Sequence, residues 1–188
     1  MNKRVEQIRT DALVAKTLYT KRLRVANGFK VAINILIIIT PILFIAAQYV
    51  TKGTALAGLT DTTAFIGSIL LLCLAIYTLS INLDGNIQKN VIGLKNNVYV
   101  ASEALKLIDE VSDEKLNWFY TYVAEMDTVD ADALSNVSEE ERQKAYRSAL
   151  MQLKPGDNSV VCPICGASPF RYTKGNCQVC GNKPVIIQ

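Results

Sequence analysis

The chain of 188 residues contains no histidine, and this absence removes much of the usual chemistry of enzymes. Histidine is the side chain that enzymes use most often as a general acid or base. The sequence also lacks the glycine-rich phosphate loop of nucleotide hydrolases, the GxSxG elbow of serine hydrolases and the GxGxxG fingerprint of dinucleotide-binding domains. We therefore expect a protein that is not an enzyme.

Charge is the second absence, and it is confined to two long stretches. Val31–Val50 and Thr62–Leu83 contain no Asp, Glu, Lys or Arg. As helices they would extend about 30 and 33 Å at a rise of about 1.5 Å per residue, which is enough to cross the hydrocarbon core of a bilayer. The sequence thus predicts a transmembrane hairpin over residues 31–83, with spans at 31–50 and 62–83. A buried helical hairpin of a soluble protein is the alternative.

The segments around the spans differ strongly in basic residues. Residues 1–30 carry eight Lys or Arg against Glu6 and Asp11, whereas the loop between the spans carries only Lys52 and Asp61. Because basic segments stay on the cytoplasmic side, we expect a multi-pass protein of the bacterial inner membrane with both termini in the cytoplasm. Apolar residues recur every three or four positions in residues 1–30, and this predicts a basic amphipathic helix that ends near Asn27-Gly28.

Several polar side chains interrupt the apolar spans. An amide in hydrocarbon needs a partner or water, so these residues face either the other helix of the hairpin or an aqueous path. If the protein forms an oligomeric bundle, the candidates to line its axis are Asn34, Gln48, Thr78 and Asn82. Packing within the hairpin itself is the alternative.

Residues 84–154 read as a cytoplasmic helical region. A heptad stripe over 87–108 predicts a helix that packs in a coiled coil or inside one subunit, and that can carry motion to the membrane. We expect a second helix over Asp113–Met126, followed by an acidic connector over Asp127–Val137. Ser138 and the three glutamates after it form a capping box, which predicts a helix that runs to about Leu153.

Cysteine is scarce, but four of the five cysteines form one motif. Two CxxC pairs, separated by eleven residues, comprise Cys162, Cys165, Cys177 and Cys180. Four thiolates at this spacing satisfy tetrahedral Zn²⁺ and leave no position for a catalytic water. We predict a structural zinc site that holds together a small head over residues 155–188, with iron as the alternative metal. The expected fold is an all-α membrane protein: a two-helix transmembrane hairpin, cytoplasmic helices and a small C-terminal zinc ribbon or knuckle with four cysteine ligands.

Basic and aromatic side chains cluster in and before this head. They could hold phosphates and stack on a base, and a basic surface that only contacts solvent is the alternative. The candidate ligand-binding residues are Lys144, Arg147, Lys154, Arg171, Tyr172 and Lys174.

The layout resembles the SLATT family of bacterial two-span effectors of anti-phage defence. The resemblance covers the basic helix, the hairpin, the charge-poor loop, the helical region and the stretch from Glu141 through Pro155-Gly156 to Gly166. Within that family the chain is most similar to the mobile-element branch with the CxxC-x11-CxxC tail, and it is also similar to the effector of the Hailong system.

This resemblance implies an oligomeric ion channel, with a tetramer as the expected assembly, in contact with membrane lipid. Its gate would respond to a nucleotide, or to a single-stranded DNA oligomer made by a partner nucleotidyltransferase, bound on the cytoplasmic side. The alternative function is a membrane-anchored zinc-ribbon module that tethers a protein or nucleic-acid partner without conducting ions.

Overall fold

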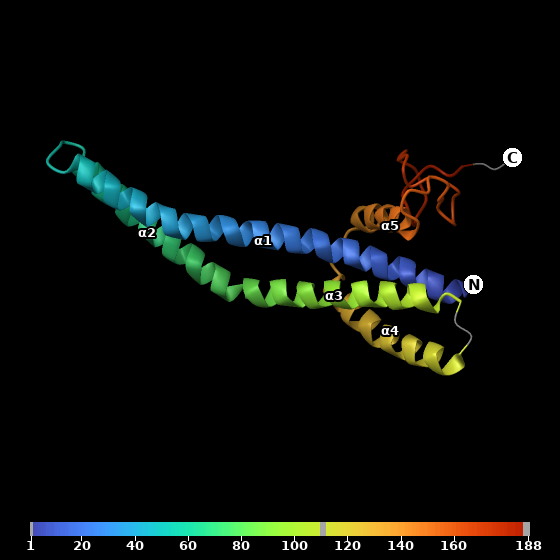
Figure 1. Ribbon diagram of the computed structural model, residues 1–188. Coiled ribbons are helices and arrows are strands. Elements are labelled where there is room, and N and C mark those ends of the chain that lie inside the picture. The colour runs from blue at the N-terminus through green and yellow to red at the C-terminus, as the bar shows by residue number, and fades with distance from the viewer. Residues whose placement is uncertain (1, 110–111, 186–188) are drawn as a thin grey trace. The chain divides into compact units, whose positions relative to one another are not determined.

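The computed structural model describes residues 2–109 and 112–185. Residues 186–188 of the expected head, and residue 1 of the expected basic helix, lie outside that range. The described residues form helices and no extended strand, which confirms the all-α class (Figure 1). The helices are α1 (Lys3–Thr51), α2 (Ala57–Ser80), α3 (Leu83–Leu107), α4 (Asp113–Ala133) and α5 (Glu139–Leu153).

The chain divides into two compact units. One unit is Leu23–Gln88, which contains the later part of α1, all of α2 and the start of α3. The other combines Met1–Arg22 with Lys89–Gln188, and it contains the start of α1, most of α3, α4, α5 and the cysteine-rich head. We call them the hairpin unit and the body unit.

Helix α1 runs through Asn27 and Gly28, where the sequence predicts an end. Glycine within a helix costs only about 1 kcal/mol, and the strong helix-forming stretches on both sides outweigh that cost. No proline follows Gly28 closely enough to stop the helix, since the first is Pro41, and the helix continues across that residue as well. The basic segment and the first apolar span are therefore one helix.

The hairpin unit pairs α2 with the later part of α1 (Figure 1). Gly67 allows a close approach, because a Cβ at that position would collide with the ring of Phe44. Only 6% of the most apolar window of each long helix is buried, so the side chains of both spans face outward. Both helices are long and apolar enough to cross a membrane. A hairpin that forms the core of a soluble domain would be mostly buried.

A local break separates α2 from α3. Asn82 is the one non-glycine residue with a positive φ, 46°, among the residues that the structure describes. Its Oδ1 accepts a hydrogen bond from the Gly85 amide at 3.3 Å, and Nδ2 of Asn86 donates to the Ile81 carbonyl at 2.9 Å. Asparagine tolerates this left-handed conformation better than most residues. These two hydrogen bonds pair backbone groups on both sides of the break, and α3 begins directly after Asn82.

The body unit is a helical bundle around a small core. The largest fully buried side chains in it are Tyr19 of α1 and Phe119 of α4. The other buried residues of the two core clusters that contain them are Val, Ala and Leu from α1, α3, α4, α5 and the connection between α4 and α5. On α3, the heptad position Ala101 is buried, while Val98 and Leu105 are about half exposed. The buried face of α3 is thus displaced from the predicted heptad stripe, and its buried residues are Gly93, Asn97, Val100, Ala101, Ala104 and Leu107.

Helix α4 is longer than its sequence pattern indicates. The acidic residues that predict a connector continue the helix to Ala133. The carboxylate of Asp130 accepts hydrogen bonds from Tyr19 Oη and from Asn97 Nδ2, both at 2.7 Å. Arg22 and Arg142 donate to the carbonyls of Ala133 and Leu134 and so cap the end of the helix. These contacts come from α1, α3 and α5, and they stabilise turns that local sequence disfavours.

Candidate metal centre

Two short turns with the same hydrogen-bond pattern carry the four cysteines. In the first turn the Gly166 amide donates to the Cys162 carbonyl, and the Cys162 amide donates to Ala167. In the second turn Gly181 donates to Cys177, and the Cys177 amide donates to Asn182. Both glycines have a left-handed φ, 69° and 71°, which explains why glycine follows each CxxC pair.

The two turns bring all four sulfur atoms together in the interior of the head. The Sγ atoms lie within 4.8 Å of one another, and all four side chains are buried. Sγ of Cys165 and Sγ of Cys180, one from each turn, are 3.4 Å apart. None of the four is in a disulfide. The prediction that these four residues form one cluster is confirmed.

The donor set and its spacing fit a tetrahedral metal ion. Sulfur atoms about 2.3 Å from a common centre would lie about 3.8 Å from each other, which is compatible with the observed cluster. The remaining cysteine, Cys73, lies in α2 and does not join them. Cys162, Cys165, Cys177 and Cys180 could therefore bind one metal ion between them.

The surroundings of the thiols favour the thiolate form of Cys177 in the second turn. Burial alone would raise the pKa of Cys177, but hydrogen bonds from the Cys180 and Val179 amides and from neighbouring thiols lower it to about 7. Burial raises the pKa of Cys165 and, more strongly, that of Cys180. Four buried thiolates would repel one another, so a bound cation is what would allow all four to ionise.

Side chains of α5 attach the head to the helical bundle. The Arg147 guanidinium donates to the Cys180 carbonyl and lies 3.9 Å from the centre of the Tyr172 ring. Gln143 Nε2 donates to the Gln178 carbonyl at 3.3 Å. Tyr146 is buried among the cysteines, and burial together with the nearby thiols raises its pKa to about 12. The head therefore forms one packed unit with α5.

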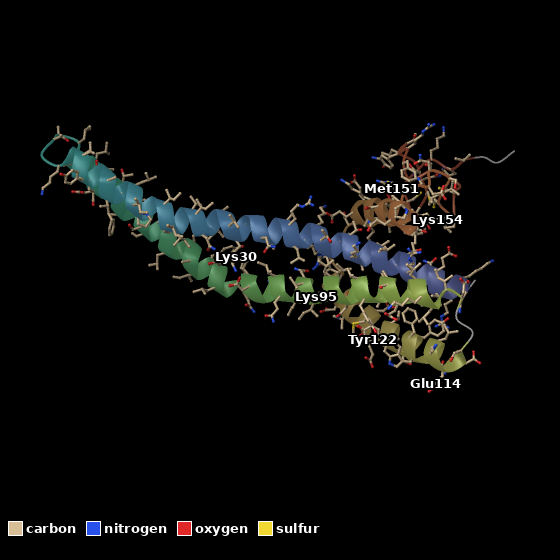
Figure 2. The ribbon with its side chains drawn as sticks, in the orientation of Figure 1. Lys30, Lys95, Glu114, Tyr122, Met151 and Lys154 are labelled. Atoms are coloured by element: carbon tan, nitrogen blue, oxygen red, sulfur yellow. The ribbon has the colours of Figure 1, made fainter. Side chains whose placement is uncertain are left out.

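Two of the sequence-predicted ligand residues contact each other, and a third lines a groove. Arg147 and Tyr172 contact each other, so one face of the Tyr172 ring is already covered. Lys144, Arg171 and Lys174 are exposed on α5 and on the head. Lys154 directly follows the last residue of α5 (Figure 2). It lines a separate groove together with residues from the start of α1.

Three of the four sequence-predicted pore residues come together in the hairpin unit. Asn34, Thr78 and Asn82 line a cavity of about 160 Å³, whose wall also includes Lys30 and Asp84. Lys30 Nζ and Asp84 Oδ1 form an ion pair at 2.6 Å. Gln48 is not among the residues that line it, and its Nε2 donates to Asp61 Oδ1 at 3.1 Å.

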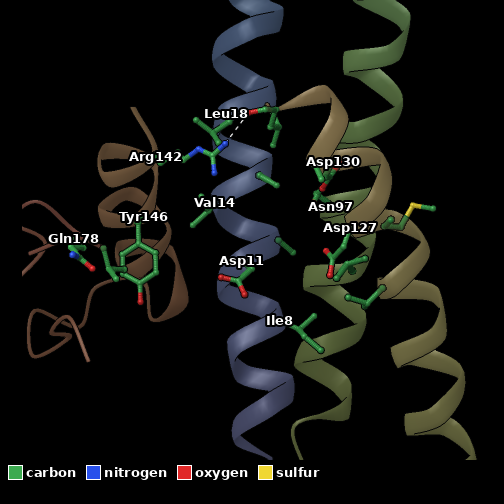
Figure 3. Close-up of a pocket in the computed structure, with 18 residues that line it drawn as sticks. Ile8, Asp11, Val14, Leu18, Asn97, Asp127, Asp130, Arg142, Tyr146 and Gln178 are labelled. Carbon is green, nitrogen blue, oxygen red and sulfur yellow. Dashed lines mark hydrogen bonds between the residues drawn. The ribbon is translucent and has the colours of Figure 1, made fainter. Parts of the chain in front are cut away.

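A further cavity of about 460 Å³ in the body unit is lined by α1, α3, α4, α5 and the second cysteine turn (Figure 3). Asp11 and Asp127 both line it. Burial raises the pKa of both carboxyls. The negative charge of Asp127 also raises the pKa of Asp11, and that of Asp130 also raises the pKa of Asp127. Arg142 is on the same wall, where it donates to the Leu134 carbonyl at 3.1 Å.

Asn182 is a site residue that sequence reasoning missed. Its side chain is 1% exposed, its Oδ1 accepts from the Thr173 amide at 2.9 Å, and its Nδ2 donates to the Ser168 carbonyl at 3.3 Å. It thus joins the loop between the two turns to the second turn. The only signal in the sequence is its position directly after the CxxC-Gly motif.

Comparisons with known proteins agree with this architecture. A family model described as "Mobilome CxxCx(11)CxxC protein" matches residues 2–183, which include both spans and the four cysteines. No curated protein and no solved structure matches the chain.

Proposed function

Because the chain belongs to the family of mobilome CxxCx(11)CxxC proteins, we propose that it acts as a membrane effector of anti-phage defence. In this proposal it is an oligomeric ion channel of the inner membrane, a tetramer in the simplest case, related to the SLATT effectors and to that of the Hailong system. The observation that carries the proposal is the union, in one chain, of two outward-facing apolar helices and a packed helical body with a four-cysteine head.

Membrane insertion is supported by the exposure of the spans. Ile38, Leu43 and Leu70 are each more than 60% exposed in the single chain, and their neighbours are similar. Burial of this surface in lipid, at about 25 cal/mol per Å² of apolar area, would strongly favour insertion. The basic residues before the first span would hold the N-terminus in the cytoplasm, and two crossings would return the C-terminal head to the same side.

We assign the metal as structural Zn²⁺. A site of four thiolates offers no open coordination position, so the ion would hold the head together and would not activate water. Without it the four buried cysteines would lack the cation that joins the two turns. Because such a site cannot activate water, we expect the effector to act by conduction and not by catalysis.

The polar residues of the hairpin support an aqueous path. Asn34, Thr78 and Asn82 gather at one end of the hairpin, next to the ion pair of Lys30 and Asp84. Polar side chains within membrane helices commonly mark ion pathways. In an assembly of several hairpins, these side chains together with Gln48 would supply the polar lining.

Gating would come from a nucleotide, or from a DNA oligomer made by a partner nucleotidyltransferase, bound on the cytoplasmic side. Such a ligand can act as a gate only if it binds one state of the channel more tightly than the other. A change from about 1% to about 99% open requires a difference in affinity of about 10⁴-fold between the two states.

Ion flux from liposomes that contain the purified full-length protein tests the proposal. We expect flux from the wild type and a large loss with Asn34→Leu, because an apolar side chain removes a polar group from the path. Ile38→Leu, on the same helix, is the matched control and should conduct normally. An absence of flux both with and without single-stranded DNA oligomers, in correctly assembled protein, would overturn the proposal.

A non-conducting tether is the second candidate, and one observation favours it. Val161, Ile164 and Val185 on the surface of the head are each about half exposed or more, and such a surface can receive a partner. A tether predicts that Asn34→Leu and Gln48→Leu leave toxicity in cells unchanged. A channel predicts that both substitutions abolish it while assembly persists.

A further inference from the structure

A groove of about 590 Å³ lies in the body unit between the start of α1 and the end of α5. The chain that leads from α5 into the first cysteine turn forms its third side. Its volume is within the range of about 300–1,000 Å³ that is typical of small-molecule sites. No part of it coincides with the four cysteines.

Basic side chains from two helices line the groove. Lys3 and Arg9 come from the first turns of α1, and Lys154 follows the last residue of α5. Arg9 Nη2 donates to the Leu153 carbonyl at 3.3 Å, which ties the two walls together. Since a guanidinium has five N–H donors, this one bond leaves others to bind an anion.

Two carboxylates, Asp157 and Glu6, also line the groove and partly offset these cations. Asp157 Oδ1 accepts from the Ser159 amide at 2.8 Å and from Ser159 Oγ at 2.5 Å. These bonds, and the charge of Lys154, lower the pKa of Asp157, so its charge is stabilised within its own turn. Glu6 is the other carboxylate on the wall, and it would oppose an anionic ligand.

The rest of the wall is apolar. Leu150 is buried, and Leu153 and Val160 are partly buried behind the basic rim. A site with cations at its rim and aliphatic side chains on its wall suits a ligand with an anionic group and an apolar or planar body. A phosphate matches several converging N–H donors better than a single carboxylate does.

We propose that this groove binds a small phosphate ester, with the phosphate on Lys3, Arg9 and Lys154 and the organic body against Leu150, Leu153 and Val160. Where the ester is a nucleotide, the inference rests on the proposed function and gives its cytoplasmic ligand a site, but the groove would bind its ligand whether or not the protein conducts ions. A phosphate ester of this size is either a nucleotide or the head of an anionic lipid, and the groove chemistry is the same for both.

Calorimetric titration of the full-length protein in detergent tests the proposal with three probes. Adenosine 5′-monophosphate represents a nucleotide, dihexanoyl phosphatidic acid represents a lipid, and inorganic phosphate is the anion alone. We expect at least one ester to saturate a single site and to bind about tenfold tighter than inorganic phosphate, because only an ester reaches the apolar wall. The ester that binds identifies the source of the ligand.

Two substitutions should change the affinity in opposite directions. Lys154→Gln should weaken binding of the ester about tenfold, because it removes a charged donor. Glu6→Gln should tighten binding, because it removes the opposing carboxylate. Lys95→Gln changes an exposed lysine of α3 outside the groove, so it is the matched control and should leave the affinity unchanged.

Three results would overturn the proposal: neither ester saturates a site, inorganic phosphate binds as tightly as the esters, or Lys95→Gln weakens binding as much as Lys154→Gln does. The last would mean that the basic surface as a whole attracts anions. The titration does not depend on conduction, so a failure here is distinct from an absence of flux in liposomes.

Discussion

The hydroxyl of Tyr19 donates a hydrogen bond to Oδ1 of Asp130 at 2.7 Å, and this contact joins α1 to α4. Tyr19 is only 1% exposed, and its ring lies against Gly93 of α3. A Cβ on Gly93 would collide with this ring, so glycine is the residue that allows the three helices to meet.

Gly93→Ala should therefore destabilise the body unit. The added methyl group must displace a buried aromatic ring, and overpacking of this kind costs about 1–3 kcal/mol. Gly28→Ala is the control, because a Cβ there would meet nothing within 4 Å and alanine favours a helix by about 1 kcal/mol. Thermal unfolding in detergent should show a lower midpoint for the first variant and an equal or higher midpoint for the second.

Removal of the metal should unfold the head. Because a bound cation would join the four buried cysteines of the two turns, a chelator should make residues 155–185 sensitive to protease, while the helical signal of α1 and α2 remains. Elemental analysis should find one zinc per chain in the wild type and in Cys73→Ser, and less in Cys165→Ser. Stoichiometric iron in place of zinc, or full metal content in Cys165→Ser, would contradict the assignment.

Arg147→Ala should loosen the head without removing any metal ligand. It deletes both the hydrogen bond to the Cys180 carbonyl and the contact with the Tyr172 ring. We expect faster transfer of zinc to a colorimetric chelator, by several-fold. Lys144→Ala changes an exposed lysine on the same helix and should release zinc at the wild-type rate. Equal rates in both variants would mean that the contact of Arg147 does not stabilise the head.

Two aspartates should affect stability with opposite dependence on pH. Burial raises the pKa of Asp127 in the folded state, so its ionised form is unfavourable at neutral pH. Asp127→Asn should stabilise the protein at about pH 7, and this gain should shrink as the pH falls through the raised pKa toward the unfolded value of 3.8.

Asp157 is the opposite case, because bonds from Ser159 lower its pKa in the folded state. The stability that ionised Asp157 contributes is complete at pH values above its unfolded pKa of 3.8. It is lost as the pH falls through the lower pKa of the folded state. Asp157→Asn should thus be slightly destabilising at neutral pH and without effect in strong acid. Unfolding midpoints from about pH 3 to about pH 8 would separate the two aspartates, and parallel curves would contradict both predictions.

Local sequence patterns predict those parts of the structure that depend on local interactions. The CxxC spacing identifies the four clustered cysteines, and Ser138, which accepts from the Glu141 amide at 3.3 Å, marks the start of α5. The end of α4 follows a different rule. Its last turns are acidic and lack a regular apolar pattern, and they are helical because of partners on α1, α3 and α5.

The groove is hidden from the sequence for a similar reason. Lys3 and Lys154 are about 150 positions apart, and only the packing of α5 on α1 brings them to one surface. Sequence reasoning groups Lys154 with Arg147 and Tyr172, because these residues are close along the chain. In the structure, Arg147 of α5 contacts the Tyr172 ring and the Cys180 carbonyl, and these contacts attach the head to α5.

The left-handed backbone of Asn82 makes the separation of α2 from α3 sensitive to the side chain at this position. A β-branched residue at this position would find that conformation costly and would favour ordinary helical angles. The two helices would then tend to fuse into one. The amino acid at the end of the second apolar stretch thus helps to determine whether the helix of that stretch is interrupted or continues into the next one.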